Sequence, residues 1–252
     1  MNKFESINRI RASLKNGCSI GGWMQIPHPS VAEIMGHSGY DWVAIDLEHG
    51  SIGVSRLPDL FRSLELGDTL PLVRLADGSK KDCKSALDAG AGGVIVPMVE
   101  NASQIKEIIN SCCWPPTGNR GVGFSRANLF GKNFDSYFKE AQAPLIIAMI
   151  ESIGAVDNLK DILKVEGLDA ILIGPYDLSA SIGMTGKFEK KEFIELINRI
   201  KKTAKSQNIA CGIHVVEPSE HMLELRIKEG YSFIPYSLDA VFLNHAAKKP
   251  LI

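Results

Sequence analysis

The chain has 252 residues, with 28 Lys and Arg against 29 Asp and Glu, which gives a formal net charge of −1 at pH 7. Opposite charges are interspersed, so no basic surface predicts binding to nucleic acid or to an anionic membrane. The longest apolar runs are far shorter than the ~20 residues of a membrane-spanning helix, and the first segment, MNKFESINRIRASLKNG, has no apolar signal core, so we expect a cytoplasmic protein.

Apolar runs of strand length alternate with segments of helical periodicity along the chain. A capped helix leads, and the expected strands are Ser19–Ile26, Trp42–Leu47, Leu70–Leu75, Gly93–Val99, Leu145–Ile150, Ala170–Ile173, Ala210–Val216 and Ser232–Ser237. The expected intervening and closing helices are Val31–Ser38, Val54–Leu66, Lys80–Ala89, Ala102–Cys112, Val156–Leu163, Glu189–Gln207, Ser219–Lys228 and Leu238–Lys248. The stretch Trp114–Ala143 interrupts this rhythm and predicts an irregular connection.

The strand runs are apolar throughout, as in parallel sheets whose two faces are both buried. An open doubly wound sheet also alternates strands with helices, but it usually has fewer strands and a glycine fingerprint after the first strand. Here Pro27-His28-Pro29 follows the first strand. Eight repeats in about 250 residues are typical of a (β/α)8 TIM barrel. We therefore predict an α/β fold, with one barrel domain over residues 1–252 and an extra N-terminal helix.

Two carboxylates stand at the carboxyl ends of neighbouring predicted strands. Glu151 follows Leu145–Ile150, and Asp177 follows Ala170–Ile173 in the sequence Gly174-Pro175-Tyr176-Asp177. Parallel neighbours lie about 4.8 Å apart, so the two anions would repel unless a cation lies between them. Oxygen ligands favour Mg²⁺ or Mn²⁺. Each carboxylate alone is also explained as a helix N-terminal cap, but the pair predicts a metal site.

Other polar residues gather at the same strand ends, where a barrel has its active face. His49 lies beside Glu48 and is a candidate general base, with a histidine satisfied by backbone as the alternative. Arg74 is a candidate clamp for an oxyanion or carboxylate, with a structural salt bridge as the alternative. Asp88 stands near a helix carboxyl end; it is either solvated or a partner that orients the His49 ring.

The remaining candidates concern substrate contacts. The backbone N–H groups around Gly174, Tyr176 and Asp177 suit a substrate carboxylate. Trp23 and His214 line the same rim as pocket walls, although ordinary packing explains them equally well. No lysine lies within any predicted strand, so a Schiff-base mechanism has no obvious nucleophile.

The sequence resembles the HpcH/HpaI aldolase family of metal-dependent, class II pyruvate aldolases, which includes 4-hydroxy-2-oxoheptanedioate aldolase and 2-dehydro-3-deoxyglucarate aldolase. The resemblance covers nearly the whole chain. The motifs that carry it are Asp46-Leu47-Glu48-His49-Gly50, Pro71-Leu72-Val73-Arg74, Leu87-Asp88-Ala89-Gly90-Ala91, Val96-Pro97-Met98-Val99, Arg120-Gly121-Val122-Gly123, Ile150-Glu151-Ser152 and Ile173-Gly174-Pro175-Tyr176-Asp177-Leu178-Ser179.

The resemblance implies an enzyme that reversibly cleaves a 4-hydroxy-2-oxo acid into pyruvate and an aldehyde. It implies Glu151 and Asp177 as ligands of Mg²⁺ or Mn²⁺, with Co²⁺ as a further candidate, and His49 as the base. Asp88 matches the partner of that histidine, and Arg74 matches the residue that steadies the pyruvate enolate. Two positions depart from close members: Met149 replaces a glutamine, and His214 replaces an apolar residue that lines the aldehyde pocket.

The resemblance also implies a homo-oligomer, a hexamer built as a trimer of dimers, with the last helix exchanged between subunits. We expect the loop Gly118–Asn133 to close the active site of a neighbouring subunit, with Phe124 and Arg126 at the aldehyde end; a solvated loop is the alternative. Two other functions stay open. One is a citramalyl- or malyl-CoA lyase, which needs a basic groove for the CoA phosphates, and the other is a non-catalytic barrel that binds metal or keto acid.

Overall fold

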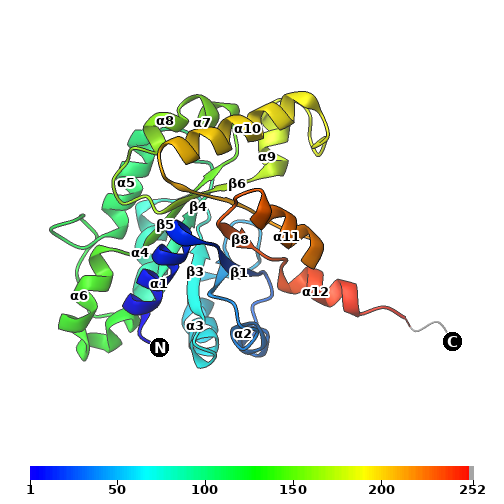
Figure 1. Cartoon of the computed structure of the whole chain (residues 1–252). Coiled ribbons are helices and arrows are strands. Elements are labelled where there is room, and N and C mark those ends of the chain that lie inside the picture. The colour runs from blue at the N-terminus through cyan, green and yellow to red at the C-terminus, as the bar shows by residue number, and fades with distance from the viewer. Residues whose placement is uncertain (250–252) are drawn as a thin grey trace.

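Eight parallel strands close into a barrel in the computed structural model, which describes residues 1–249 (Figure 1). The strands pair in sequence order, and β1 pairs with β8 to close the ring. They are β1 (Ser19–Met24), β2 (Trp42–Asp46), β3 (Leu70–Arg74), β4 (Gly93–Val96), β5 (Leu145–Ile150), β6 (Ala170–Ile173), β7 (Ala210–Ile213) and β8 (Phe233–Pro235). The predicted (β/α)8 barrel is confirmed.

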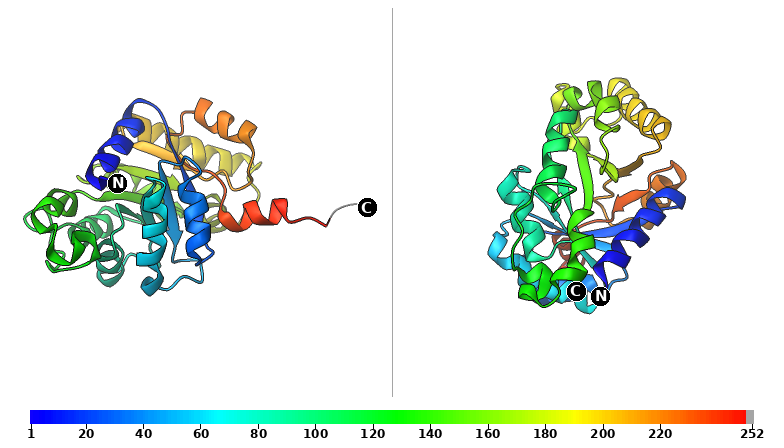
Figure 2. Two further views of the ribbon diagram at one scale, coloured as in Figure 1. Left: turned by 90° about the horizontal axis from the view of Figure 1, so that it is seen from below. Right: turned by 90° about the vertical axis from the view of Figure 1, so that its left-hand side faces the viewer.

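Helices surround the strands, and the views from two further sides agree on this arrangement (Figure 2). The α-helices are α1 (Lys3–Asn16), α2 (Pro29–Gly36), α3 (Leu57–Leu66), α4 (Lys80–Ala89), α5 (Ala102–Cys112), α6 (Phe134–Gln142), α7 (Ile153–Asp157), α8 (Leu159–Ile162), α9 (Pro175–Ser181), α10 (Lys191–Ser206), α11 (Glu220–Lys228) and α12 (Asp239–Ala246). The chain also contains two 3-10 helices, η1 (Val54–Arg56) and η2 (Arg126–Gly131).

The barrel has two hydrophobic layers. Alternate strand residues point into the lumen, because side chains in a strand alternate between its faces. The lumen cluster contains Trp42 stacked on Phe233, with ring centroids 4.2 Å apart. The extra N-terminal helix α1 belongs to this cluster through Ile7, Ile10 and Leu14, so it closes the amino end of the barrel. The other strand faces pack against the surrounding helices.

Several parts of the chain differ from the sequence-based prediction, and the expected helix Val156–Leu163 is divided into α7 and α8. The stretch Trp114–Ala143 was expected to be irregular, but it contains η2 and the helix α6. The expectation is wrong because Tyr137 and Ala141 of α6 pack against Trp114 and form a small third core. The short helix α9 after β6 was also not expected. Across residues 1–249, no helix is both long and apolar enough to span a bilayer.

Candidate active site at the carboxyl-end mouth of the barrel

The strand alternation that fills the lumen also delivers polar side chains to its carboxyl-end mouth. In β2, Trp42 and Ala44 point inward and Asp46 follows; in β3, Leu72 precedes Arg74. In β5, Leu145, Ile147 and Met149 are in the lumen cluster, and the next residue of that series is Glu151. The same spacing places Gln25, His214 and Ser237 after β1, β7 and β8.

Asp46 is the centre of the hydrogen-bond network at the mouth. Its buried carboxylate accepts from Arg74 Nε at 2.9 Å and Nη2 at 2.5 Å, from Gln25 Nε2 at 2.8 Å and from the Trp23 indole N–H at 3.2 Å. The backbone N–H groups of Glu48 and His49 also donate to it. Burial alone would raise its pKa, but the Arg74 guanidinium and these donors lower it to about 2. Asp46 is therefore a permanent anion that fixes Arg74.

Arg74 carries a second ion pair to Glu48, whose Oε2 lies 2.9 Å from Arg74 Nη1. The guanidinium also stands 5.1 Å from the centroid of the Trp23 ring. Burial raises the pKa of Glu48, and the nearby anions Asp46 and Asp177 act in the same direction. His49 is exposed and close enough to Glu48 to lower that pKa through its charge. These contacts place His49, Arg74 and Asp177 around one mouth.

Glu151 is the most deeply buried of the predicted metal ligands, with 3% of its surface exposed. Its Oε2 accepts a hydrogen bond of 2.9 Å from the backbone N–H of Met98, a residue held at φ 50°. A Cβ at Gly174 would lie 2.4 Å from Glu151 Oε1, so any side chain here would displace the Glu151 carboxylate. Burial raises the Glu151 pKa to about 7, and the charges of Glu48 and Asp177 add to the rise.

Asp177 lies in the first turn of α9 and is exposed. Within residues 1–249 no side chain caps this helix, so the N–H groups of Tyr176 and Asp177 have no side-chain acceptor there. The Tyr176 ring is 58% exposed and packs edge-on against Phe188 at 5.0 Å. The first turn of α9 therefore offers N–H groups beside two carboxylates.

Trp23 and His214 form the wall on the β1 and β7 side. Their ring centroids are 5.2 Å apart. Trp23 is buried, and His214 Nε2 lies 3.0 Å from the backbone carbonyl of Ser237. Burial lowers the His214 pKa to about 4, so the ring is neutral at pH 7.

Asp88 does not join this cluster within the described chain. It is near the last residue of α4, which returns to the amino end of the barrel, and its carboxylate pairs with Arg120 Nη1 at 3.4 Å. Arg120 is 1% exposed and also donates to the Tyr137 hydroxyl at 2.9 Å. Arg126 is bound to Glu65 at 2.7 Å, whereas Phe124 is 75% exposed.

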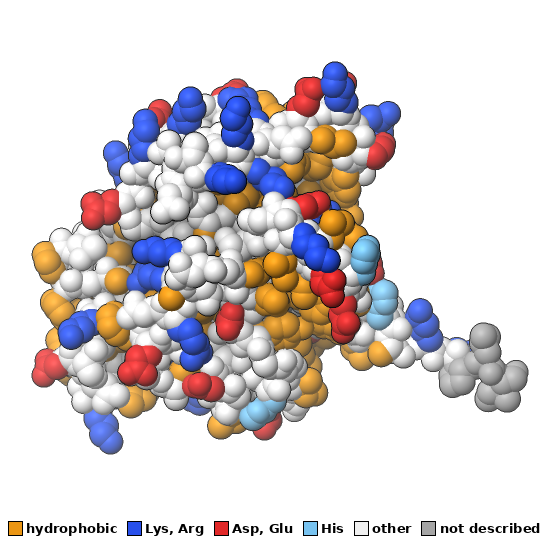
Figure 3. Space-filling model, viewed as in Figure 1, with side chains coloured by type: hydrophobic (Ala, Val, Ile, Leu, Met, Phe, Trp, Pro, Cys, Tyr) orange, Lys and Arg blue, Asp and Glu red, His pale blue; other side chains and the backbone are white. Residues whose placement is uncertain are grey.

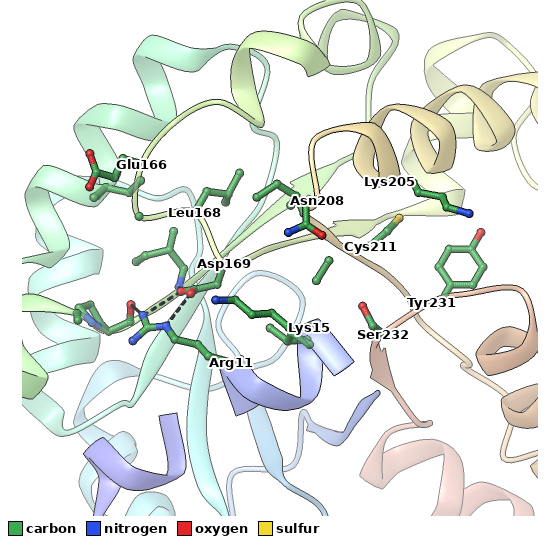
Figure 4. A pocket seen from close by; sticks show the side chains of 18 of the residues that line it. Arg11, Lys15, Glu166, Leu168, Asp169, Lys205, Asn208, Cys211, Tyr231 and Ser232 are labelled. Carbon is green, nitrogen blue, oxygen red and sulfur yellow. Dashed lines mark hydrogen bonds and ion pairs between the residues drawn. The ribbon is translucent and has the colours of Figure 1, made fainter. Parts of the chain in front are cut away.

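A large hollow of about 1230 Å³ lies at the opposite end of the barrel, where α1, α10 and the starts of β6 to β8 meet (Figure 4). Arg11 and Asp169 pair across it at 2.7 Å. It contains none of the residues predicted for chemistry. The carboxyl-end mouth is therefore the candidate active site, as expected for a barrel.

The donor set at the mouth suits a hard divalent cation. No group of three or more His, Cys, Asp and Glu within residues 1–249 is arranged to hold a metal. A site with Glu151 and Asp177 needs only two protein ligands, since Mg²⁺ usually keeps several waters and binds through one or two carboxylates plus substrate. Buried Glu151 and exposed Asp177 repel each other, and this repulsion supplies the electrostatic reason for such an ion.

Sequence reasoning missed three contributors to the mouth. The Gln25 side chain donates to Asp46, and the backbone N–H of Met98 donates to Glu151. Asp239 of α12 accepts from the backbone N–H groups of Gln25 and Ile26, at 2.9 Å each. The inward position of Gln25 was readable from the alternation of β1. The Met98 and Asp239 contacts depend on loop geometry, for which the sequence gives no signal.

The closed barrel, with an arginine among carboxylates at its carboxyl-end mouth, has the architecture of the (β/α)8 enzymes. A model of the HpcH/HpaI aldolase/citrate lyase family matches residues 19–246. The chain belongs to this family. The expected enzyme class, an aldolase that acts as a carbon–carbon lyase, is confirmed.

Similar proteins agree with this assignment. The chain is 34% identical to a hydroxypyruvate/pyruvate aldolase of Roseobacter denitrificans, over 96% of this chain and 95% of the relative. It is 36% identical to a 2-keto-3-deoxy-L-rhamnonate aldolase of Salmonella gallinarum, over 95% and 90% of the two chains. A crystal structure of an HpcH/HpaI aldolase/citrate lyase family protein from Burkholderia cenocepacia has a TM-score of 0.88 and 28% identity, covering 95% of this chain and 96% of the other.

Proposed function

We propose that the chain is a metal-dependent pyruvate aldolase that reversibly cleaves a 4-hydroxy-2-oxo acid into pyruvate and an aldehyde. The observation that carries the proposal is Glu151. It is a buried carboxylate with one backbone N–H donor, and the charges of Glu48 and Asp177 act on it. A buried anion close to two other carboxylates requires a compensating cation.

Glu151 and Asp177 would hold that cation, with Mg²⁺ or Mn²⁺ preferred by the oxygen donors and Co²⁺ as a further candidate. When bound, a divalent metal supplies Lewis-acid stabilisation of negative charge on the oxygens of pyruvate. Gly174 supports this assignment, because its missing side chain lets the β6 end approach Glu151 closely. The metal-dependent relatives implied by the sequence motifs point in the same direction.

Other groups of the chain would bind the substrate, stabilise the developing charge and move the proton. The N–H groups of Tyr176 and Asp177 would bind the pyruvate carboxylate, since the first turn of a helix favours anions. Arg74, fixed by Asp46, would stabilise the charge that develops as the carbon–carbon bond breaks. His49 would remove the proton from the 4-hydroxyl directly or through water. Its exposure leaves it free to meet a substrate.

The CoA lyase alternative gains no support at the mouth. The groups that surround it are mainly acidic, and Arg74 is already committed to Asp46 and Glu48. A CoA chain would require cations for its phosphates.

A homo-oligomer would complete the site. The helix α12 extends away from the barrel in Figures 1 and 2. In Figure 3, hydrophobic side chains gather near α11, α12 and α2, and exposed Leu225, Ile227, Leu243 and Ile34 belong to these helices. An exposed apolar surface of this kind suits a second copy. In the proposed homo-oligomer, the last helix is exchanged between subunits, and Asp88 of one subunit reaches His49 of another.

The test is an aldol assay with pyruvate and a panel of aldehydes, with and without a chelator. We expect chelator-sensitive product formation that returns when Mg²⁺ or Mn²⁺ is added. Chelator-resistant activity of Glu151→Ala and Asp177→Ala, at the wild-type rate, would refute the assignment of the two ligands.

A further inference from the structure

The mouth has a second side that the pyruvate chemistry does not use. Glu151 and Asp177 lie after β5 and β6, whereas Gln25, His214 and Ser237 lie after β1, β7 and β8. Because these three strands are consecutive in the closed ring, their end residues form one continuous rim. Trp23 links this rim to the charged network, since its ring contacts His214 and its N–H donates to Asp46.

Two unused polar atoms on this rim, on His214 and Gln25, are hydrogen-bond acceptors. The Ser237 carbonyl only accepts, so the neutral His214 ring must carry its hydrogen on Nε2, which leaves Nδ1 as an acceptor. Gln25 Nε2 donates to Asp46, so the other end of that amide is the acceptor Oε1. Ser237 Oγ is buried and has no hydrogen-bond partner within residues 1–249.

The charge on this rim is negative. Asp46 and Asp239 are both buried carboxylates, and the Arg74 guanidinium is committed to Asp46 and Glu48. Asp239, in the first turn of α12, accepts from the backbone N–H groups of Gln25 and Ile26, so these donors are already occupied by a carboxylate. Arg56 is exposed nearby and donates to the Pro27 carbonyl at 3.3 Å.

We propose that this rim selects a small, uncharged, hydroxyl-bearing aldehyde, with half-buried His214 as the residue that recognises its hydroxyl group. The rim disfavours aldehydes that carry a second carboxylate or a phosphate, because it presents acceptors and anions to them. This inference rests on the proposed aldolase function and adds the class of the aldehyde.

The experiment compares aldehydes of matched size in the metal-loaded enzyme with pyruvate. Glycolaldehyde is compared with acetaldehyde and with glyoxylate, and glyceraldehyde with propionaldehyde and with glyceraldehyde 3-phosphate. One hydrogen bond between uncharged groups changes kcat/KM by about 3- to 10-fold, and we expect the hydroxylated member to lead by at least that factor. The charged members should be slower than their hydroxylated counterparts by more than about tenfold.

His214→Leu should reduce the preference for glycolaldehyde over acetaldehyde to near one, whereas Ser237→Ala removes a fully buried hydroxyl and should keep the preference. Lys202→Ala, on α10 at the opposite hollow, is the matched control and should keep the wild-type ratio. Thermal unfolding of each variant checks that it is folded.

Metal-dependent exchange of the pyruvate methyl protons, measured without aldehyde, distinguishes a failure of the aldolase function from a failure of the aldehyde selectivity. A wild-type enzyme without exchange would refute the aldolase itself. Exchange together with equal use of glycolaldehyde and acetaldehyde would refute only the selectivity. The selectivity would also be refuted if the wild type used glyoxylate efficiently and Arg56→Ala abolished that activity. This result would show that Arg56 forms a binding site for an anionic aldehyde.

Discussion

Replacing Glu151 by Gln should make the metal-free protein more stable at alkaline pH and remove its stabilisation by metal. Burial raises the Glu151 pKa from 4.5 to about 7. A pKa difference of one corresponds to about 1.4 kcal/mol, so ionised Glu151 costs the metal-free fold about 3 kcal/mol above pH 7. The carboxyl is protonated in both states below pH 4.5, so the cost is absent there and grows as the pH rises towards 7. Gln keeps the side-chain shape and its carbonyl acceptor for the Met98 N–H without the charge.

The assay is thermal unfolding of chelator-treated wild type and Glu151→Gln at pH 5 and pH 8.5, each with and without Mg²⁺ or Mn²⁺. The metal-free variant should melt above the wild type at pH 8.5 and close to it at pH 5. Metal should raise the melting temperature of the wild type, because a ligand that binds only the folded state stabilises it. The variant should show little of that rise. Glu100→Gln is the matched control, since Glu100 is an exposed carboxylate on the same rim that accepts from Ser152.

Two results would contradict this reasoning. An equal rise of the melting temperature with metal in wild type and Glu151→Gln would show that the ion binds elsewhere. A metal-free variant less stable than the wild type at pH 8.5 would show that the ionised carboxylate is compensated within the chain.

Three further predictions concern the chemistry. Borohydride treatment with pyruvate should leave the protein mass unchanged, because no strand carries a lysine; a mass gain on a lysine with loss of activity would overturn the metal-dependent mechanism. His49→Ala should lower the cleavage rate by ~10²–10⁴, the usual effect of losing a general base, while metal binding measured by titration persists; near-normal cleavage would remove His49 from the mechanism. Phe124→Ala should impair aldol cleavage more than pyruvate proton exchange if its loop covers a neighbouring site, with Phe138→Ala of α6 as an exposed aromatic control; a subunit assembly in which Phe124 lies far from every mouth would end that idea.

The barrel was predictable because its two periodicities are strong. Continuous apolar runs of four to six residues alternate with amphipathic helices, and the strand alternation fixes which residue reaches the mouth. That alternation gives the inward position of Glu151 from Leu145, Ile147 and Met149 without any structural information. The helix α6 was missed, although Tyr137 and Ala141 have helical spacing, because the glycine-rich segment before it suggested a continuous loop.

The role of Asp46 was harder to predict. In the sequence it is one of several polar residues after β2, and Glu48 and His49 attract equal attention. Its importance comes from three-dimensional contacts: donors from β1, β3 and its own loop converge on one buried carboxylate. Such convergence depends on the strand register, in which Asp46 lies opposite Arg74, and local sequence patterns carry no register information across a barrel.

The position of Asp88 in a single chain does not explain the role that the sequence motif predicts for it. The motif that contains it is a helix ending, and the topology of a βα repeat places helix carboxyl ends at the amino face of the barrel. Asp88 therefore pairs there with Arg120, next to the loop that exposes Phe124. Both features lie at the end opposite to His49 in the same chain. If both serve the active site, they serve that of another copy, and the amino face of one barrel must then meet the mouth of the next. The buried Arg120 has a clear purpose in that arrangement, because it holds a carboxylate that its own subunit does not use.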